Sequence, residues 1–267
     1  MSIVVAAAAV LWACGGSSSS PRDPAPSKPV AAVAPAPPEL AFVLSVPSLD
    51  HGLDGWQAFA DAVSPRAGAD LRAWLAEGKA RSEGMDLRKP IRVVALASAS
   101  EDQGWGLLVA PTDTTKLKAA FGAVRQAGAW AFISSPETID RLAPWALESL
   151  ALQPTPAAPE VTIYPGPLLA TFADEIVTAR AEWVDRSDAA ASVVAGLFDG
   201  FVAGIRQCER VEMRYEASAV RATIEVVVFP RAGTPIAAFV ARQKPATFEL
   251  LPRLTTGDAM VVAAGRG

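Results

Sequence analysis

The order in which short apolar runs alternate with helical patterns most limits what this chain can fold into. In the first half, four short apolar runs at 41–46, 91–97, 105–110 and 130–134 are typical of strands. Between them, apolar side chains recur at helical spacing through 53–75, with a break at Pro65, and through 117–124. The resulting order βαββαβ predicts a ferredoxin-like half.

The second half repeats this order. Strand patterns cover 161–164, 211–217, 222–229 and 259–264, and helical stripes run through 168–176, 194–205 and 236–240. When residues 109–119 are shifted by 119 positions onto 228–238, four of the eleven residues are identical. We therefore expect an internal duplication. The strand at 259–264 either completes the second half, which we favour, or opens a further unit.

These patterns predict an α+β protein made of two ferredoxin-like βαββαβ halves, with a mainly antiparallel sheet covered by helices. The first half spans 39–134 and the second spans 160–267. Residues 135–159 form a connecting helix and linker, because Ser135 is a suitable N-cap and Pro136 suits the first helical position. Pro144 is expected to kink or split this helix.

The chain begins with an apolar run that is too short to cross a bilayer. Residues 3–13 are apolar, whereas a spanning helix needs about 20 such residues. A secretory signal with a short apolar core fits this length better. The segment Leu11-Trp12-Ala13-Cys14 resembles the lipobox of bacterial lipoproteins. The resemblance implies that 1–13 is a removed signal peptide and that Cys14 is lipidated; an ordinary terminus with a chance cysteine is the alternative.

Residues 14–38 carry Cys14 and a linker of glycine, serine, proline and alanine. Such a composition predicts a disordered, partly extended tether between the lipid anchor and the domain. In the same resemblance, Gly15 after the cysteine implies sorting to the periplasmic face of the outer membrane. Beyond the lipobox, the domain is similar in general organisation to uncharacterised duplicated domains of envelope lipoproteins, and no activity follows from that.

The residues that could carry chemistry are few. His51 is the one histidine, without a second histidine or a nearby cysteine to share a metal, so we expect a solvated residue at a helix entry. Cys208 is expected to be a buried small hydrophobe. Gly104-Trp105-Gly106 lacks the third glycine of a dinucleotide loop and indicates hairpin glycines instead. The sequence predicts no cofactor, no metal site and no catalytic residue.

Three function classes remain. The first is a tethered binding or scaffolding module for a protein or envelope component. The second is a carrier of a lipophilic ligand between sheet and helices, because 222–229 is apolar on both faces. The third is a hydrolase that uses His51. A net charge of -4 gives no indication of nucleic-acid binding.

Overall fold

The computed structural model describes residues 34–98, 104–187 and 191–242. The predicted signal peptide, Cys14, most of the linker and the strand predicted at 259–264 lie outside these residues. The chain divides into two compact units, one of residues 30–176 and 210–228, called the sheet unit, and a second of 1–29, 177–209 and 229–267. Each unit is described by itself.

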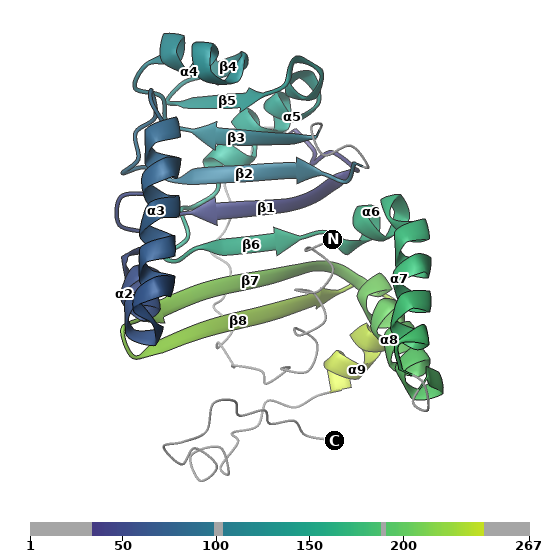
Figure 1. The fold of residues 1–267 in the computed structure, drawn as a ribbon. Helices are drawn as coiled ribbons and strands as arrows, with labels where there is room; N and C mark the ends of the chain where they lie inside the picture. Colours follow the sequence, from purple (N-terminus) through teal and green to yellow (C-terminus); the bar gives the residue numbers. More distant parts are fainter. Residues whose placement is uncertain (1–33, 99–103, 188–190, 243–267) are drawn as a thin grey trace. The chain divides into compact units, whose positions relative to one another are not determined.

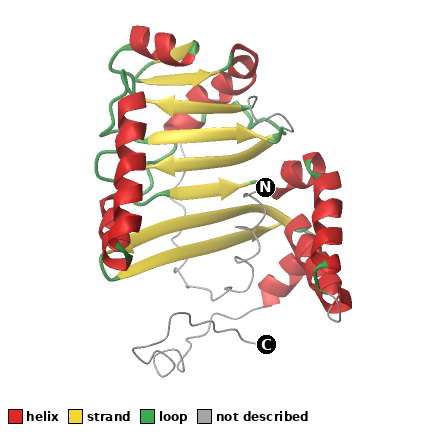
Figure 2. Cartoon of the chain, in the orientation of Figure 1, coloured by secondary structure: helices red, strands yellow, loops and turns green. Residues whose placement is uncertain are grey.

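Eight strands form one antiparallel sheet in the order β4-β5-β3-β2-β1-β6-β7-β8 (Figures 1 and 2). The strands are β1 (Leu40–Val46), β2 (Ile91–Leu96), β3 (Trp105–Val109), β4 (Ala123–Ala127), β5 (Trp130–Ser134), β6 (Glu160–Ile163), β7 (Cys208–Ser218) and β8 (Arg221–Pro230). The hairpins predicted at 91–110 and at 211–229 are confirmed.

The helices fall between these strands. In the sheet unit they are α2 (Asp54–Val63), α3 (Pro65–Arg81), α4 (Thr114–Phe121), α5 (Pro136–Glu148), the short 3₁₀ turn η1 (Leu150–Leu152) and α6 (Pro165–Thr171). The chain continues through α7 (Ala173–Asp185), α8 (Ala191–Arg206) and α9 (Pro235–Arg242). In the second unit, α7 and α8 are joined by Arg180, which donates from Nε and Nη2 to the Asp199 carboxylate at 2.6 and 2.8 Å.

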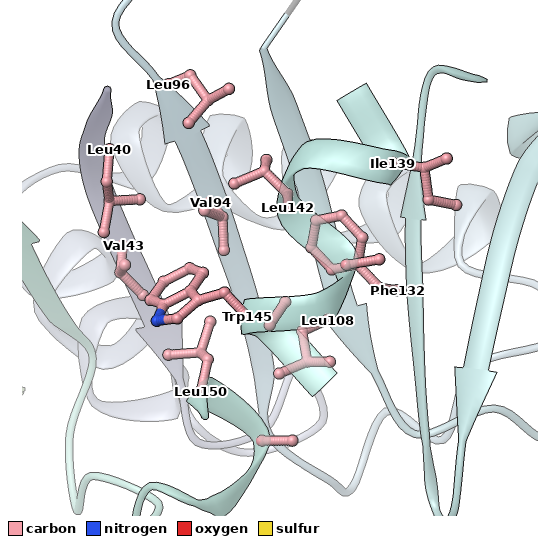
Figure 3. Close-up of a cluster of buried hydrophobic side chains, with 13 residues drawn as sticks. Leu40, Val43, Val94, Leu96, Leu108, Phe132, Ile139, Leu142, Trp145 and Leu150 are labelled. Atoms are coloured by element: carbon pink, nitrogen blue, oxygen red, sulfur yellow. The ribbon is translucent and has the colours of Figure 1, made fainter. Parts of the chain in front are cut away.

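The main core lies between α5 and one face of the sheet, called the α5 face. Ser135 caps α5 by accepting a hydrogen bond from the Thr138 backbone N–H at 3.3 Å, as predicted, and the helix continues through Pro144. The buried side chains that meet here come from β1, β2, β3, β5 and α5, and Figure 3 shows them gathered around Trp145. They include Val94, Leu108, Phe132, Leu142 and Trp145.

A smaller core lies on the opposite face, called the α4 face. Asp113 caps α4 by accepting hydrogen bonds from the backbone N–H groups of Thr115 and Lys116 at 2.9 and 3.2 Å. The cap directs the fully buried Leu117 toward Ile133 of β5. The predicted continuation of this helix to residue 124 is wrong, because α4 ends at Phe121 and residues 123–127 form strand β4.

The α+β class and the antiparallel sheet covered by helices are confirmed, but the strand order is not ferredoxin-like. In a ferredoxin-like half, the first strand lies between the third and fourth strands of the same half, whereas here β1 pairs with β2 of its own half and with β6, and β2 pairs with β3. The physical reason is the connection after β1. One crossover helix returns the chain for a parallel strand, whereas the two successive helices α2 and α3 return it for an antiparallel one.

The predicted duplication stays a prediction. From the central pair of β1 and β6, strands β2 and β3 follow outward on one side and β7 and β8 on the other, but β5 and β4 beyond β3 have no counterpart in the described second half. The shift of 119 residues places the end of β3 and the start of α4 on the end of β8 and the start of α9.

Candidate functional site

A single row of side chains crosses the sheet on the α5 face and changes from apolar to charged along its length. From β5 to β7, the strand registers align Phe132, Leu108, Arg92, Ser45, Glu160 and Arg214. Glu225 of β8 continues the row, with its Oε2 3.6 Å from Nη1 of Arg214. The apolar end is fully buried in the main core, whereas Arg214 and Glu225 are exposed. Arg92 lies where the row changes from apolar to charged side chains.

Arg92 is a buried cation that is held by backbone carbonyl groups. Its side chain is among the largest fully buried ones, with a relative exposure of 1%. Its Nη1 donates to the carbonyl oxygen of Leu150. Its Nη2 donates to the carbonyl oxygens of Gln153 at 2.7 Å and Pro154 at 3.2 Å. These oxygens lie just beyond the C-terminal end of α5, and the negative end of a helix dipole favours a cation.

The remaining surroundings of Arg92 leave its charge incompletely matched. The centre of the guanidinium lies 6.0 Å from the ring centroid of Trp130, a cation–π distance. Among the described residues, no carboxylate lies within ion-pair distance of Arg92, and its buried Nε has no hydrogen-bond partner. Burial lowers the pKa of Arg92, because desolvation disfavours the charged form. An arginine nevertheless stays protonated at neutral pH.

A cavity of about 250 Å³ opens beside Arg92. Its other polar walls are the side chains of Ser45, Gln153, Thr155, Glu160 and Arg214. The side chains of Ser45, Gln153 and Thr155 make no hydrogen bond to other residues in the described part of the chain. The cavity therefore brings unused donors to the side of a buried cation, and polar groups of this kind fix the orientation of a ligand.

The two charged groups on the far wall satisfy each other. Arg214 Nε donates to Glu160 Oε2 at 2.8 Å, and this hydrogen bond raises the pKa of Arg214. Glu160 is the more enclosed partner, because its side chain is 22% exposed against 49% for Arg214. The pair thus adds no net charge to the cavity.

The candidate residues from the sequence analysis lie outside this cavity. His51 has an 81% exposed side chain in the turn before α2, and its Nδ1 lies 3.2 Å from Asp54 Oδ2, which confirms a solvated helix entry. Ser48 donates its hydroxyl to the Leu87 carbonyl at 2.9 Å, so it is not paired with His51 as a nucleophile. Cys208 is buried, as predicted, and its thiol lies 3.4 Å from the Gly204 carbonyl oxygen.

A second hollow, of about 350 Å³, lies between α2 and α3. Leucines 49, 53 and 75 with Ala76 form its apolar walls, and Asp50, Arg72 and Lys79 are among its polar residues. Within residues 34–98, 104–187 and 191–242, no group of three or more potential metal ligands is present. Over the same residues, no helix combines the length and apolarity needed to span a bilayer.

Sequence reasoning missed Arg92 and the cavity beside it. Arg92 interrupts the apolar run 91–97, and its register position faces the core together with Val94 and Leu96. A charged residue at an inward position of a buried strand was the available signal, because such a charge needs a specific partner. Comparison of the sequence with family models and curated proteins, and of the fold with solved structures, finds no match.

Proposed function

We propose that this chain is a membrane-tethered, extracytoplasmic lipoprotein that works as a binding or scaffolding module in the cell envelope. Cys14 carries the lipid anchor, and the tether holds the domain at the periplasmic face of the outer membrane. Support comes from the lipobox-like segment that ends at Cys14 and from the Gly/Ser/Pro composition that follows it. The first strand begins at Leu40, directly after the predicted tether.

The observation that carries a binding role is the cavity beside Arg92. A buried cation without a carboxylate partner, next to side chains with unused hydrogen-bonding groups, is costly unless a ligand or water satisfies it. Binding proteins accept such local costs because the ligand offsets them. A net charge of -4 favours a protein or envelope component as the partner over nucleic acid.

A second candidate function is the transport of a lipophilic ligand, and the hollow between α2 and α3 favours it. Its walls include three leucines, and the volume of about 350 Å³ accepts part of an apolar chain. The hollow lies between two helices, whereas the sequence placed a lipid cavity between the sheet and its helices. We rank this function second, because the same leucines also hold the helix pair together.

The tether is tested by labelling the full chain with an alkyne analogue of palmitate in a bacterium. The wild type should incorporate the label and partition with membranes, and Cys14→Ser should lose both properties. Cys208→Ala is the matched control and should keep both, because Cys208 is buried in the folded protein. A wild-type chain that stays unlabelled in the cytoplasm contradicts the proposal.

The binding role is tested by photo-crosslinking in the native envelope. A benzophenone amino acid at Thr155, on the wall of the cavity, should give a discrete adduct. The same amino acid at the exposed Thr223 of β8 serves as control and should not give that adduct. Adducts that form equally from both positions, or from neither, contradict a binding role for the cavity.

A further inference from the structure

The charged side chains that line the cavity beside Arg92 sum to a single positive charge, and Glu225 lies outside this lining, against Arg214. Glu160 and Arg214 cancel each other through their 2.8 Å ion pair. Arg92 has only neutral carbonyl acceptors at its Nη1 and Nη2 atoms. A buried charge of this kind is normally matched by an opposite charge. The cavity therefore favours a group with one negative charge.

The hydrogen-bonding groups on the cavity walls match the acceptor oxygens of such a group. Ser45 and Thr155 each bring a hydroxyl and Gln153 an amide, and all three are donors. The Nε–H of Arg92 has almost no accessible surface, so it is not one of these donors. A carboxylate only accepts hydrogen bonds and offers about four acceptor positions on two oxygens. The two hydroxyl groups and the two amide N–H groups of Gln153 supply four donors, which matches the four acceptor positions.

We propose that this cavity binds one carboxylate group, with Arg92 supplying the charge and Ser45 and Thr155 supplying hydrogen bonds. The inference rests on the proposed binding function and names the chemistry of its ligand. A phosphate dianion fits less well, because Glu160 lies on the wall and Arg214 is already paired with it. The volume of about 250 Å³ leaves room for a carboxylate and a short chain.

This carboxylate has two sources that share one chemistry. It is either a small free acid or the C-terminal carboxylate of a peptide. The cavity is open to solvent at Gln153 and Thr155, both of which are exposed, so a chain attached to the carboxylate can leave through this side. The experiment separates the two sources by comparing acetate with a short peptide.

The test uses the purified full chain in detergent and follows thermal unfolding by tryptophan fluorescence while acetate is added. A ligand that binds the folded state raises the unfolding temperature progressively with its concentration. We expect acetate to raise it and acetamide, which has the same shape without the charge, to have no effect. Acetyl-dialanine with a free C-terminus is compared with its amide, and inorganic phosphate is titrated separately.

The double variant Ser45→Ala/Thr155→Val removes two donors and leaves Arg92 and its carbonyl partners in place. Its affinity for acetate should fall about tenfold or more, because each hydrogen bond is made to a charged group. Thr223→Val is the matched control on β8 and should bind as the wild type does. Arg92→Lys keeps the charge and loses the planar donor, and it should bind more weakly wherever it folds.

The titrations either assign the source of the carboxylate or overturn the carboxylate site. A tenfold preference for the free peptide over acetate assigns the site to a C-terminus, and equal affinities assign it to a small acid. Equal stabilisation of the wild type and the double variant by acetate, equal effects of acetate and acetamide, or tighter binding of phosphate overturns the carboxylate site. An envelope adduct at Thr155 together with failure of these titrations would leave the binding module standing and refute only the ligand class.

Discussion

A Cβ atom on Gly106 would lie 2.3 Å from Cζ of Phe132 and 3.0 Å from the carbonyl oxygen of Ile133. Gly106 is buried in β3, and the Phe132 ring fills the space above it in the main core. This position therefore needs glycine for close approach and not for an unusual backbone angle.

Gly106→Ala should lower the free energy of unfolding by about 1–3 kcal/mol, because the Phe132 ring has no room to move aside in a packed core. Gly78→Ala is the matched control. A Cβ there meets nothing within 4 Å, and the residue lies inside α3, so alanine should raise stability by up to about 1 kcal/mol. Urea unfolding of both variants measures the difference, and equal stability of the two would contradict the packing argument.

Arg92→Met should lower the free energy of unfolding by about 2–4 kcal/mol, because the carbonyl groups of Leu150 and Gln153 lose their donor. Arg125→Met is the control, since the Arg125–Asp140 pair is exposed and should contribute less than about 1 kcal/mol. Chemical denaturation with both variants provides the comparison. A loss for Arg92→Met as small as that for Arg125→Met would show that the buried guanidinium is not needed to hold residues 150–154.

Asp61 makes the stability of the α2–α3 pair depend on pH. Hydrogen bonds from Arg72 and then from Gln57 hold the pKa of Asp61 below its ordinary value of 3.8. A carboxyl with a lowered folded pKa stabilises the fold above the unfolded pKa, and this contribution is lost as the pH falls through the folded pKa. The difference in unfolding temperature between wild type and Asp61→Asn should therefore be present at neutral pH and vanish in acid.

The control for this series is Asp70→Asn. Asp70 lies 3.9 Å from Arg66, and both side chains are largely exposed, so its substitution should change the unfolding temperature little at any pH. Thermal scans from neutral pH down into the acid range, below the ordinary carboxyl pKa, follow the loss of this contribution. A constant difference between wild type and Asp61→Asn across that range would disprove the assignment.

Trp56→Ala should cost about 1–3 kcal/mol of unfolding free energy, because the Trp56 ring packs edge-on against Phe59 and Tyr215 at centroid distances of 6.2 and 6.4 Å. Trp74 of the neighbouring helix is 62% exposed, and Trp74→Ala should cost less than about 0.5 kcal/mol. Calorimetric unfolding of the pair provides the measurement. A larger loss of unfolding free energy for Trp74→Ala than for Trp56→Ala would mean that a partner covers this helix in solution.

Hydrophobic periodicity predicted most of the elements but not their arrangement. The strands β1, β2, β3, β5, β6, β7 and β8 were all identified, because short apolar runs bounded by turn residues are a strong signal. Strand β4 was missed, since it is an edge strand with Arg125 and Gln126 exposed, and Val124 continued the helical spacing of Leu117. Gly122, with φ of +86°, ends the helix and was the available sign.

The predicted element order led to the wrong strand order, because the observed first half has two helices after β1 and the additional strand β4. The break at Pro65 was the decisive clue, since it turns one crossover helix into two. The helical stripe that includes Val63 and Trp74 also predicted a buried helix face. Both residues are more than 60% exposed, because the pair meets the sheet through other positions such as Trp56.

The candidate site could not be predicted from the sequence for a different reason. Arg92, Ser45 and Glu160 are brought together by strand register alone, across three strands whose pairing the sequence does not specify. The carbonyl groups that hold Arg92 belong to the backbone, so no residue type in the sequence indicates them. Only the inward position of Arg92 within an apolar strand could have been noticed.

The pairing of β1 with β6 also determines how this protein reaches its native state. Phe42 lies opposite Ile163, a separation of 163 − 42 = 121 residues, whereas β2 and β3 are joined by a short hairpin. Because closing a long loop costs more entropy than closing a short one, we expect the outer hairpins to form early and the central ladder to form late. Until then β1 and β6 would each present an unpaired apolar edge, so the slow step of folding is also the one most exposed to aggregation.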